Sequence, residues 1–281
     1  MKANSDEYKI SRMCKLLSVS RSGYYQWLKR PASERELRHR SLLKAIQTIF
    51  ADSRQNYGRR RVHRQMSAQG QHCNHKVVSA LMKKHSIKPE RRRKFRSTTD
   101  SKHDLRVDKN LLNRQFEVDT PNSAWVSDIT YIETKEGWLY LAVFIDLYSR
   151  QIVGWSAKAD MTVELVLAAY EEARTSTGAV PNLVHSDRGS QYASNAFRTA
   201  LSNSNSMQSM SGKGNCWDNA VAESFFSTLK SEMIYRVATF ETRDQAQFAL
   251  FDYIEMFYNT KRLHSALGYL TPAEVTLKEC M

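Results

Sequence analysis

From Asn122 onward the sequence predicts an order of strands and helices that is compatible with few folds. Two runs rich in aromatic and β-branched residues, 125–132 and 138–145, flank a short connection that ends in Gly137, which predicts a β-hairpin. The further elements expected from periodicity are a strand at 152–156, a helix at 163–174, a strand ending at residue 187, a helix at 195–201 and a strand at 208–211. Three antiparallel strands followed by alternating helices and strands predict an α/β fold.

Three acidic residues stand within these elements. Asp128 lies in the first strand, Asp187 follows the apolar pair Leu183 and Val184, and Glu223 lies in the first turns of a later helical pattern. Carboxylates from two strands and a helix can form a site of hard oxygen ligands. Mg²⁺ or Mn²⁺ in such a site keeps several waters and binds substrate phosphates, so few protein ligands are needed. The sequence therefore predicts a site for two such ions.

The residues around these acids form three motifs. They read Trp125-x-x-Asp128-Ile129-Thr130, His185-Ser186-Asp187-x-Gly189, and Gly214-Asn215-Cys216-x-Asp218-Asn219-Ala220-x-x-Glu223. With this spacing the chain resembles the second-frame transposase protein of the insertion-sequence-3 family, within the superfamily of retroviral integrases and DDE transposases. The resemblance covers roughly residues 40–275. It implies a ribonuclease-H-like integrase catalytic core, preceded by a helical helix-turn-helix region and followed by C-terminal helices.

The resemblance also implies an activity. The chain is expected to be a DNA transposase that binds element ends and catalyses metal-dependent strand cleavage and strand transfer, as in DNA integration and recombination. Asp128, Asp187 and Glu223 are then the catalytic triad, with Asp128 bridging two ions and the other acids on one ion each. One ion would activate water or a DNA 3′-hydroxyl, and the other would stabilise the leaving 3′-oxygen. Two alternatives stay open: a non-catalytic DNA-binding regulator of transposition, and a structure-selective nuclease with the same core.

Asp146 is a competing carboxylate near the same hairpin. If the hairpin folds about Lys135, Asp128 lies opposite roughly residue 142, and Asp146 is then about 13 Å away. We therefore expect Asp146 to open the turn at residues 146–150 rather than to bind an ion.

Charge is distributed unevenly along the chain. Residues 1–115 hold 29 Lys and Arg against 9 Asp and Glu, a net of +20, whereas residues 116–281 hold 13 against 20, a net of −7. This asymmetry predicts a polyanion-binding region ahead of a catalytic one, although charge alone fits an RNA-binding protein equally. The expected units are a helix-turn-helix-like segment at 1–35, a second helix-turn-helix-like DNA-binding region at 36–90, a basic linker at 91–118, and the catalytic core with C-terminal helices at 119–281.

Both front units have the pattern of two helices joined by a turn. In the first, Ser20 is expected to cap a helix whose first residue, Arg21, reaches into a DNA groove; a helical hairpin without DNA contacts fits the same residues. In the second, Asn74 is expected to cap a helix. The residues expected to contact phosphates are Arg59, Arg60, Arg61 and Arg64 in the second unit and Arg91, Arg92 and Arg93 in the linker.

Further DNA contacts are expected close to the acids, at Lys230, Lys213, Asn215 and Arg188. Lys230 lies two turns after the acid of its helix, about 10 Å along the axis, and the resemblance assigns it a DNA contact. Asp218 or Asn219 is expected to cap this helix. Arg262 and His264 either approach DNA or brace the same helix, and the sequence leaves both possibilities open.

The remaining patterns restrict cofactors and location. His72, Cys73, His75 and His85 have no second cysteine at zinc-ligand spacing, so no zinc site is expected. The four scattered cysteines predict reduced thiols. The sequence has no apolar run of about 18 residues and no signal-peptide pattern, which predicts a cytoplasmic, nucleoid-associated protein without membrane contact. The resemblance implies as partners double-stranded DNA (terminal inverted repeats and target), further copies of the chain on DNA, and an upstream-frame protein or frameshift fusion.

Overall fold

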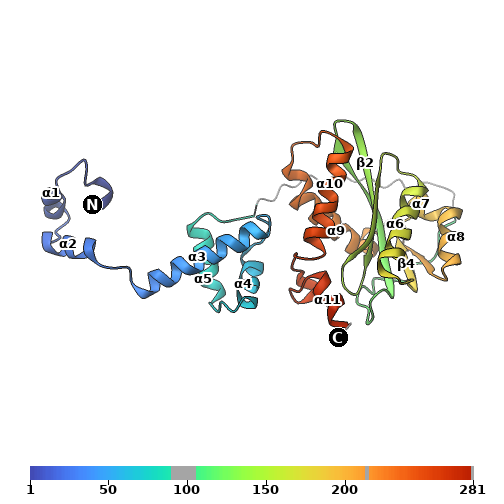
Figure 1. The fold of residues 1–281 in the computed structure, drawn as a ribbon, viewed down its shortest axis with the longest axis horizontal. Helices are drawn as coiled ribbons and strands as arrows, with labels where there is room; N and C mark the ends of the chain where they lie inside the picture. Colours follow the sequence, from blue (N-terminus) through green and yellow to red (C-terminus); the bar gives the residue numbers. More distant parts are fainter. Residues whose placement is uncertain (90–105, 213–214, 280–281) are drawn as a thin grey trace.

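The computed structural model describes residues 1–89, 106–212 and 215–279, and it contains a helical front part and an α/β core (Figure 1). The core is built on a five-stranded sheet with the strand order β3-β2-β1-β4-β5. The strands are β1 (Ala124–Thr134), β2 (Gly137–Asp146), β3 (Ile152–Lys158), β4 (Leu183–Ser186) and β5 (Met207–Met210). Strands β1, β2 and β3 are antiparallel, and β4 and β5 continue the sheet in parallel from β1. The α/β fold expected from the sequence is confirmed.

The hairpin register differs by one residue from the expected one. Thr134 pairs with Gly137, so the turn is centred between Lys135 and residue 136 rather than at Lys135 itself, and Gly137 has a φ of +108°. Asp128 consequently lies opposite Val143. The pairing that places residue 142 opposite Asp128 is therefore wrong.

Asp146 has the structural role expected of it. It lies opposite Trp125, three residues along the strand pair from Asp128, which corresponds to about 10 Å. Its side chain is 1% exposed and accepts hydrogen bonds from the backbone N–H groups of Asn122 and Ser149 and from the Ser149 hydroxyl, at 3.0, 2.9 and 2.7 Å. These bonds hold the turn after β2.

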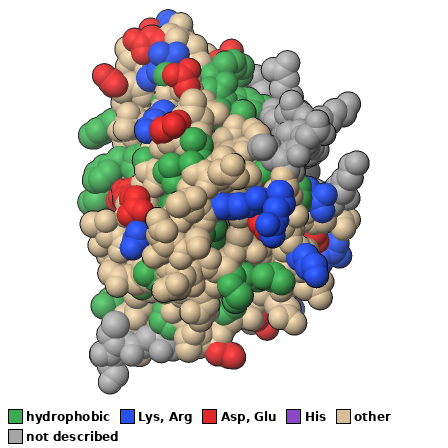
Figure 2. Space-filling model, turned by 90° about the vertical axis from the view of Figure 1, so that its right-hand side faces the viewer, with side chains coloured by type: hydrophobic (Ala, Val, Ile, Leu, Met, Phe, Trp, Pro, Cys, Tyr) green, Lys and Arg blue, Asp and Glu red, His purple; other side chains and the backbone are tan. Residues whose placement is uncertain are grey.

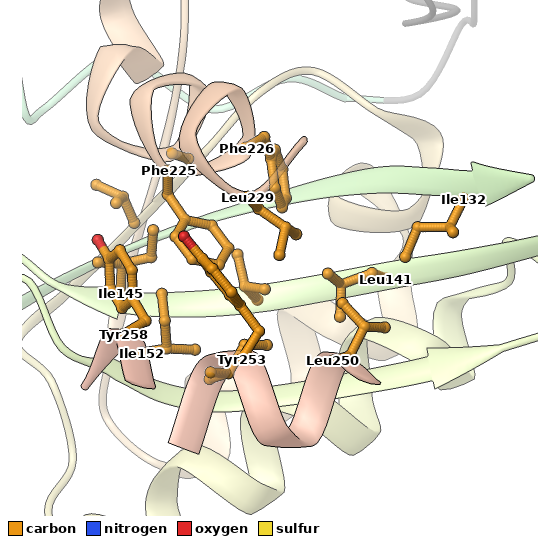
Figure 3. Packing of buried hydrophobic residues seen from close by; sticks show 14 of the residues in the cluster. Ile132, Leu141, Ile145, Ile152, Phe225, Phe226, Leu229, Leu250, Tyr253 and Tyr258 are labelled. Atoms are coloured by element: carbon orange, nitrogen blue, oxygen red, sulfur yellow. The ribbon is translucent and has the colours of Figure 1, made fainter. Parts of the chain in front are cut away.

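The sheet is covered on both faces. Helices α6 (Val163–Thr177), α7 (Ser190–Ala193) and α8 (Asn195–Asn203) lie on one face, and α9 (Ala220–Glu232) and α10 (Arg243–Tyr253) lie on the other (Figure 1). Because side chains alternate along a strand, Trp125 and Phe144 pack on the α6 side, whereas Val126 and Ile145 pack on the α9 side. Figure 3 shows the second of these layers, where aromatic and aliphatic side chains of α9 and α10 meet the sheet.

Short elements complete the back half of the core. They are η2 (Cys216–Asn219), η3 (Ile234–Arg236), the π-helical η4 (Ile254–Tyr258), η5 (Ser265–Leu267) and α11 (Pro272–Glu279). A capping box starts α11, because the Glu274 N–H donates to Thr271 Oγ1 and the Thr271 N–H donates to Glu274 Oε2.

The front part consists of helices, as its two helix-turn-helix patterns predict. They are η1 (Lys2–Asn4), α1 (Ile10–Leu16), α2 (Arg21–Lys29), α3 (Glu34–Asp52), α4 (Arg59–Ala68) and α5 (His75–Lys84). The side chains of Ser20 and Asn74 accept backbone hydrogen bonds at the starts of α2 and α5, as predicted. Helices α3, α4 and α5 share a hydrophobic core that includes Ile46, Val62 and Val78.

This helical core is closed by the C-terminal part of the chain. Leu263 packs within it, and the Tyr57 hydroxyl donates to the Lys261 carbonyl at 2.9 Å and accepts from the Leu263 N–H at 2.7 Å. Arg54 Nη1 lies 2.7 Å from Asp252 Oδ2. The second helix-turn-helix-like unit is therefore packed against the catalytic core rather than tethered beside it.

The described part of the expected basic linker belongs to the core. Leu112 is 4% exposed in the α9-side cluster, and Ser209 Oγ accepts from the N–H groups of Leu111 and Leu112 at 2.9 and 3.1 Å. Leu112 and the partly buried Phe116 and Val118 thus attach this part of the chain to the sheet layer. Arg91, Arg92 and Arg93 lie outside the described residues.

Candidate active site

The sheet brings two of the three predicted acids to adjacent positions. Strands β1 and β4 pair in parallel with Val126 opposite His185, so Asp128 within β1 and Asp187 just after the end of β4 follow at the same level, each two residues further along. Adjacent strands are about 4.8 Å apart. Both acids fall on the alternation that faces α9, as Val126 does.

Helix α9 carries the third acid to this place. Ala222, Phe225, Phe226 and Leu229 form its buried face and anchor it on the sheet (Figure 3). Glu223 lies in its first turn. At the helix start, Asn219 Nδ2 donates to the Ser127 carbonyl at 3.1 Å, which fixes α9 beside the residue that precedes Asp128.

The pKa of Asp128 reflects the closeness of the other two acids. Burial raises the pKa of the Asp128 carboxyl well above its ordinary value, and the nearby charges of Asp187 and Glu223 raise it further. The N–H of Ile129 and the ammonium of Lys230 act in the opposite direction but do not offset these effects. Burial also raises the pKa of Glu223. The charges of Asp187 and Glu223 therefore disfavour the ionised form of Asp128, which Ile129 and Lys230 only partly favour.

The carboxylates of Asp128, Asp187 and Glu223 are suitable ligands for a divalent cation, although the structure does not place all three close enough to bind one ion together. Within the described ranges, no group of three Asp, Glu, His or Cys side chains is close enough to enclose an ion. Asp128 and Asp187 lie level on adjacent strands, and Glu223 is near enough to raise the pKa of Asp128. Carboxylate oxygens are hard ligands of the kind that Mg²⁺ and Mn²⁺ prefer.

Buried polar side chains support the two strands that carry the acids. Ser127 Oγ and the Tyr192 hydroxyl lie 2.8 Å apart, on the opposite face of β1 from Asp128. In β4, His185 Nδ1 lies 2.8 Å from Ser209 Oγ. Burial lowers the pKa of His185 to about 4, so this histidine is neutral and links β4 to β5. The motif containing His185 was evident in the sequence, but its partner Ser209 and the role of Tyr192 were not.

Asp218 holds the turn before α9 instead of capping the helix. Its carboxylate accepts from the Gly212 N–H at 2.8 Å, from Arg114 Nε at 2.7 Å and from Asn110 Nδ2 at 3.0 Å. The start of α9 receives no side-chain cap among the described residues, because Asn219 is directed to β1. The expectation that Asp218 or Asn219 caps α9 is therefore wrong.

Comparisons with known proteins agree with this geometry. The integrase core domain family matches residues 118–216 and a second integrase core domain family matches 223–276, while an HTH-like domain family matches 36–95. A transposase of Escherichia coli, InsF for insertion sequence IS3A, is 40% identical over 271 residues, which are 95% of this chain and 94% of the relative. This chain belongs to the insertion-sequence-3 family of transposases. A 31 kDa protein of insertion element IS600 from Shigella sonnei is 42% identical over 93% of this chain and 96% of its own length.

The solved structures that resemble this chain include retroviral integrases. A chain of the simian T-cell lymphotropic virus intasome, in complex with PP2A regulatory subunit B56 gamma, is 16% identical and matches 76% of this chain and 69% of that chain with a TM-score of 0.48. The HTLV-2 integrase catalytic core domain in complex with magnesium is 18% identical and matches 55% of this chain and 96% of that chain with a TM-score of 0.42. None of the described helices combines the length and the apolar character that crossing a bilayer requires.

In this transposase-family core, Lys230 lies beside the acids. Its Nζ is 5.1 Å from the centre of the Tyr131 ring, and burial lowers its pKa although the charge of Asp128 acts in the opposite direction. Lys230 is thus held on β1 next to the carboxylates rather than extended into solvent.

The other expected DNA contacts occupy different settings. Arg59 and Arg60 are exposed at the start of α4, whereas Arg61 turns inward, with Nη1 4.0 Å from Glu232 Oε1 and a side chain 19% exposed. The interpretation of Arg61 as a phosphate contact is therefore corrected. Arg188 Nε donates to the Ser211 carbonyl at 2.6 Å. Asn215 is exposed, Arg64 is exposed over the Tyr269 ring, and Lys213 lies outside the described residues.

Positive charge is also gathered locally on the core. Figure 2 shows the face on the α8 side of Figure 1, where Lys and Arg side chains lie together in the right half of the view. Acidic side chains on this face lie mostly towards its upper and left parts. Positive charge is thus concentrated in one part of this face.

The open question about Arg262 is resolved in favour of a brace. Arg262 donates to Glu232, the last residue of α9, through Nη2 at 2.8 Å and Nε at 2.9 Å, and the Tyr253 hydroxyl donates to Glu232 at 2.9 Å. His264 accepts from Arg262 Nη1 at 3.3 Å, and burial together with the nearby arginines lowers its pKa to about 3. Sequence reasoning missed Glu232, since only its distant partners mark it.

Proposed function

We propose that this chain is a DNA transposase whose active site is formed by Asp128, Asp187 and Glu223. The observation that carries the proposal is the convergence of carboxylates from β1, from the end of β4 and from α9, where Asp187 and Glu223 raise the pKa of the half-buried Asp128. Such a cluster is unfavourable by itself, and bound divalent cations relieve the repulsion. The membership in a transposase family agrees with this reading of the geometry.

Asp128, Asp187 and Glu223 would hold Mg²⁺ or Mn²⁺, with two ions per active site. When bound, such ions polarise a phosphodiester and favour the deprotonated form of an attacking hydroxyl. The residues of the chain hold the ligands in position: Asn219 ties α9 to β1, and Lys230 supplies a cation for a neighbouring DNA phosphate. No serine or tyrosine nucleophile is required, since water or a DNA 3′-hydroxyl attacks the phosphorus directly.

The DNA contacts proposed for this reaction fall into two groups. Arg59, Arg60 and Arg64 of α4 contact phosphates through the helical front part, and Arg91, Arg92 and Arg93, which lie outside the described residues, are further proposed phosphate contacts. Near the acids, the proposed contacts are Lys230, Lys213, Asn215 and Arg188.

The proposed substrates are the terminal inverted repeats of the element and a target duplex, which the enzyme cleaves and joins. We further propose that several copies of the chain act together on DNA, in the cytoplasm at the nucleoid. An upstream-frame protein, either separate or as a frameshift fusion, would be the protein partner.

Metal dependence tests the proposal. The purified chain, alone or fused to the product of the upstream frame, should nick duplex DNA that carries the element end in Mg²⁺ or Mn²⁺. EDTA should abolish the nicking. Cleavage that is undiminished in EDTA would overturn the assignment of the carboxylates.

A further inference from the structure

Trp217 is an exposed aromatic side chain next to the candidate active site. It is 68% exposed, compared with 0% for Trp125 and 39% for Trp138. Among the described residues no side chain makes a hydrogen bond or ring contact with its indole, and it belongs to none of the three hydrophobic clusters. Burying a large aromatic side chain is favourable by more than about 1.5 kcal/mol of free energy, so a ligand that covers the exposed indole would be stabilised by this contact.

The backbone that carries Trp217 is held firmly. The next residue, Asp218, is 2% exposed and binds Gly212, Arg114 and Asn110. The residue after that, Asn219, is 4% exposed and donates to the Ser127 carbonyl. The indole is therefore presented to solvent from a fixed position, and its exposure does not result from a free chain end.

The same anchors place Trp217 on the rim of the carboxylate cluster. Asn219 is bonded to the residue before Asp128, and Trp217 lies two residues before Asn219. With about 3.8 Å between successive Cα atoms, Trp217 lies within roughly 15 Å of Asp128. Successive nucleotides of one strand rise about 3.4 Å, so this span corresponds to about four nucleotides.

A nucleobase is the ligand that suits an exposed indole beside a DNA-binding site, because two aromatic rings can stack. A strand bound at the carboxylates exposes its bases only where pairing is broken, and an aromatic side chain stacks on an unpaired base of any sequence with a gain of about 1–3 kcal/mol. We propose that Trp217 is a stacking platform for an unpaired base of the DNA strand, within about four nucleotides of the reacting phosphodiester. This inference rests on the proposed transposase function and adds a base-binding position to it.

The test compares two short fluorescein-labelled duplexes that differ only at one end, which is either blunt or splayed by a few unpaired nucleotides. Fluorescence anisotropy measures the dissociation constants for the full chain and for its variants. The wild type should prefer the splayed duplex by about 10-fold, since one stacked base contributes about 1.4 kcal/mol. Trp217→Ala should lose this preference, and Trp217→Phe should keep most of it. The melting temperature of Trp217→Ala should equal that of the wild type, because the side chain is exposed.

Phe248→Ala is the matched control, since Phe248 is an exposed aromatic residue on α10, 75% exposed. It should retain the preference for the splayed duplex. A preference that survives in folded Trp217→Ala, or that is lost equally in Phe248→Ala, would overturn the stacking platform. Nicking of element-end DNA in Mg²⁺ is measured separately on the wild type, so a failure of the proposed function remains distinguishable from a failure at Trp217.

Discussion

Replacing Glu232 by Gln should destabilise the protein strongly. The side chains of Arg262 and Glu232 are 5% and 11% exposed, and their closest atoms lie 2.8 Å apart, so the pair is largely removed from water. Removing one partner of such a pair leaves an unpaired charge inside the protein and costs about 3–5 kcal/mol. Arg61, 4.0 Å from the same carboxylate, loses this ion pair as well. For a chain of this size the loss corresponds to a melting temperature lower by roughly 10 °C.

Thermal unfolding of matched variants tests this magnitude. Glu36→Gln is the control, because Glu36 pairs with Arg40 at 2.6 Å while the two side chains are 53% and 66% exposed, and exposed pairs contribute less than about 1 kcal/mol. A double variant, Glu232→Leu with Arg262→Met, removes both charges and should recover most of the loss. Equal melting temperatures for Glu232→Gln and Glu36→Gln would refute the interpretation of Glu232 as the anchor of α9.

Two further predictions concern pH and salt. The pKa of His264 is lowered to about 3, so the unfolded chain takes up a proton near pH 6.5 whereas the folded chain does not. The free energy of unfolding that is present above pH 6.5 is therefore lost as the pH falls toward 3, by about 2 kcal/mol at pH 5. Denaturant unfolding of His264→Gln should lack this loss. An unchanged pH dependence in this variant would contradict the burial of a neutral His264. Arg59→Ala should weaken DNA binding and reduce the salt dependence by about one counterion, whereas Arg61→Ala should keep the salt dependence and lower the melting temperature. Equal salt slopes for the two variants, measured by anisotropy, would be the opposite result.

The parts of the fold that depend on local sequence could be predicted. Ser20 and Asn74 cap helices as expected, because a capping side chain bonds to the backbone two or three residues away. Asp128 and Asp187 were recognised for a similar reason, since strand patterns place both acids and parallel pairing brings them level.

Predictions failed where a residue's partner lies far along the chain. Asp218 was expected to cap α9, but Arg114, which lies in a segment interpreted as linker, binds its carboxylate instead. Arg61 has two exposed neighbours of the same type, and only the packing of α4 against Glu232 distinguishes it from them. Arg262 could not be assigned either, because its partner Glu232 is thirty residues away.

The hairpin shows how a small local uncertainty changes a longer-range prediction. Centring the turn between Lys135 and residue 136 moves the partner of Asp128 to Val143. A two-residue turn and a longer connection both fit the residues at 133–137, so sequence alone does not fix this register.

The DNA-cleavage activity of Asp128→Asn tests the proposed active site most directly. The raised pKa of Asp128 means that its charge is disfavoured in the folded protein at neutral pH, so the neutral variant should melt at the same temperature as the wild type or higher. DNA binding should persist, since it rests on the basic front part, while Mg²⁺-dependent cleavage and strand transfer should be abolished. A folded Asp128→Asn protein that cleaves and joins element ends at a rate near that of the wild type would contradict the assignment of this carboxylate cluster.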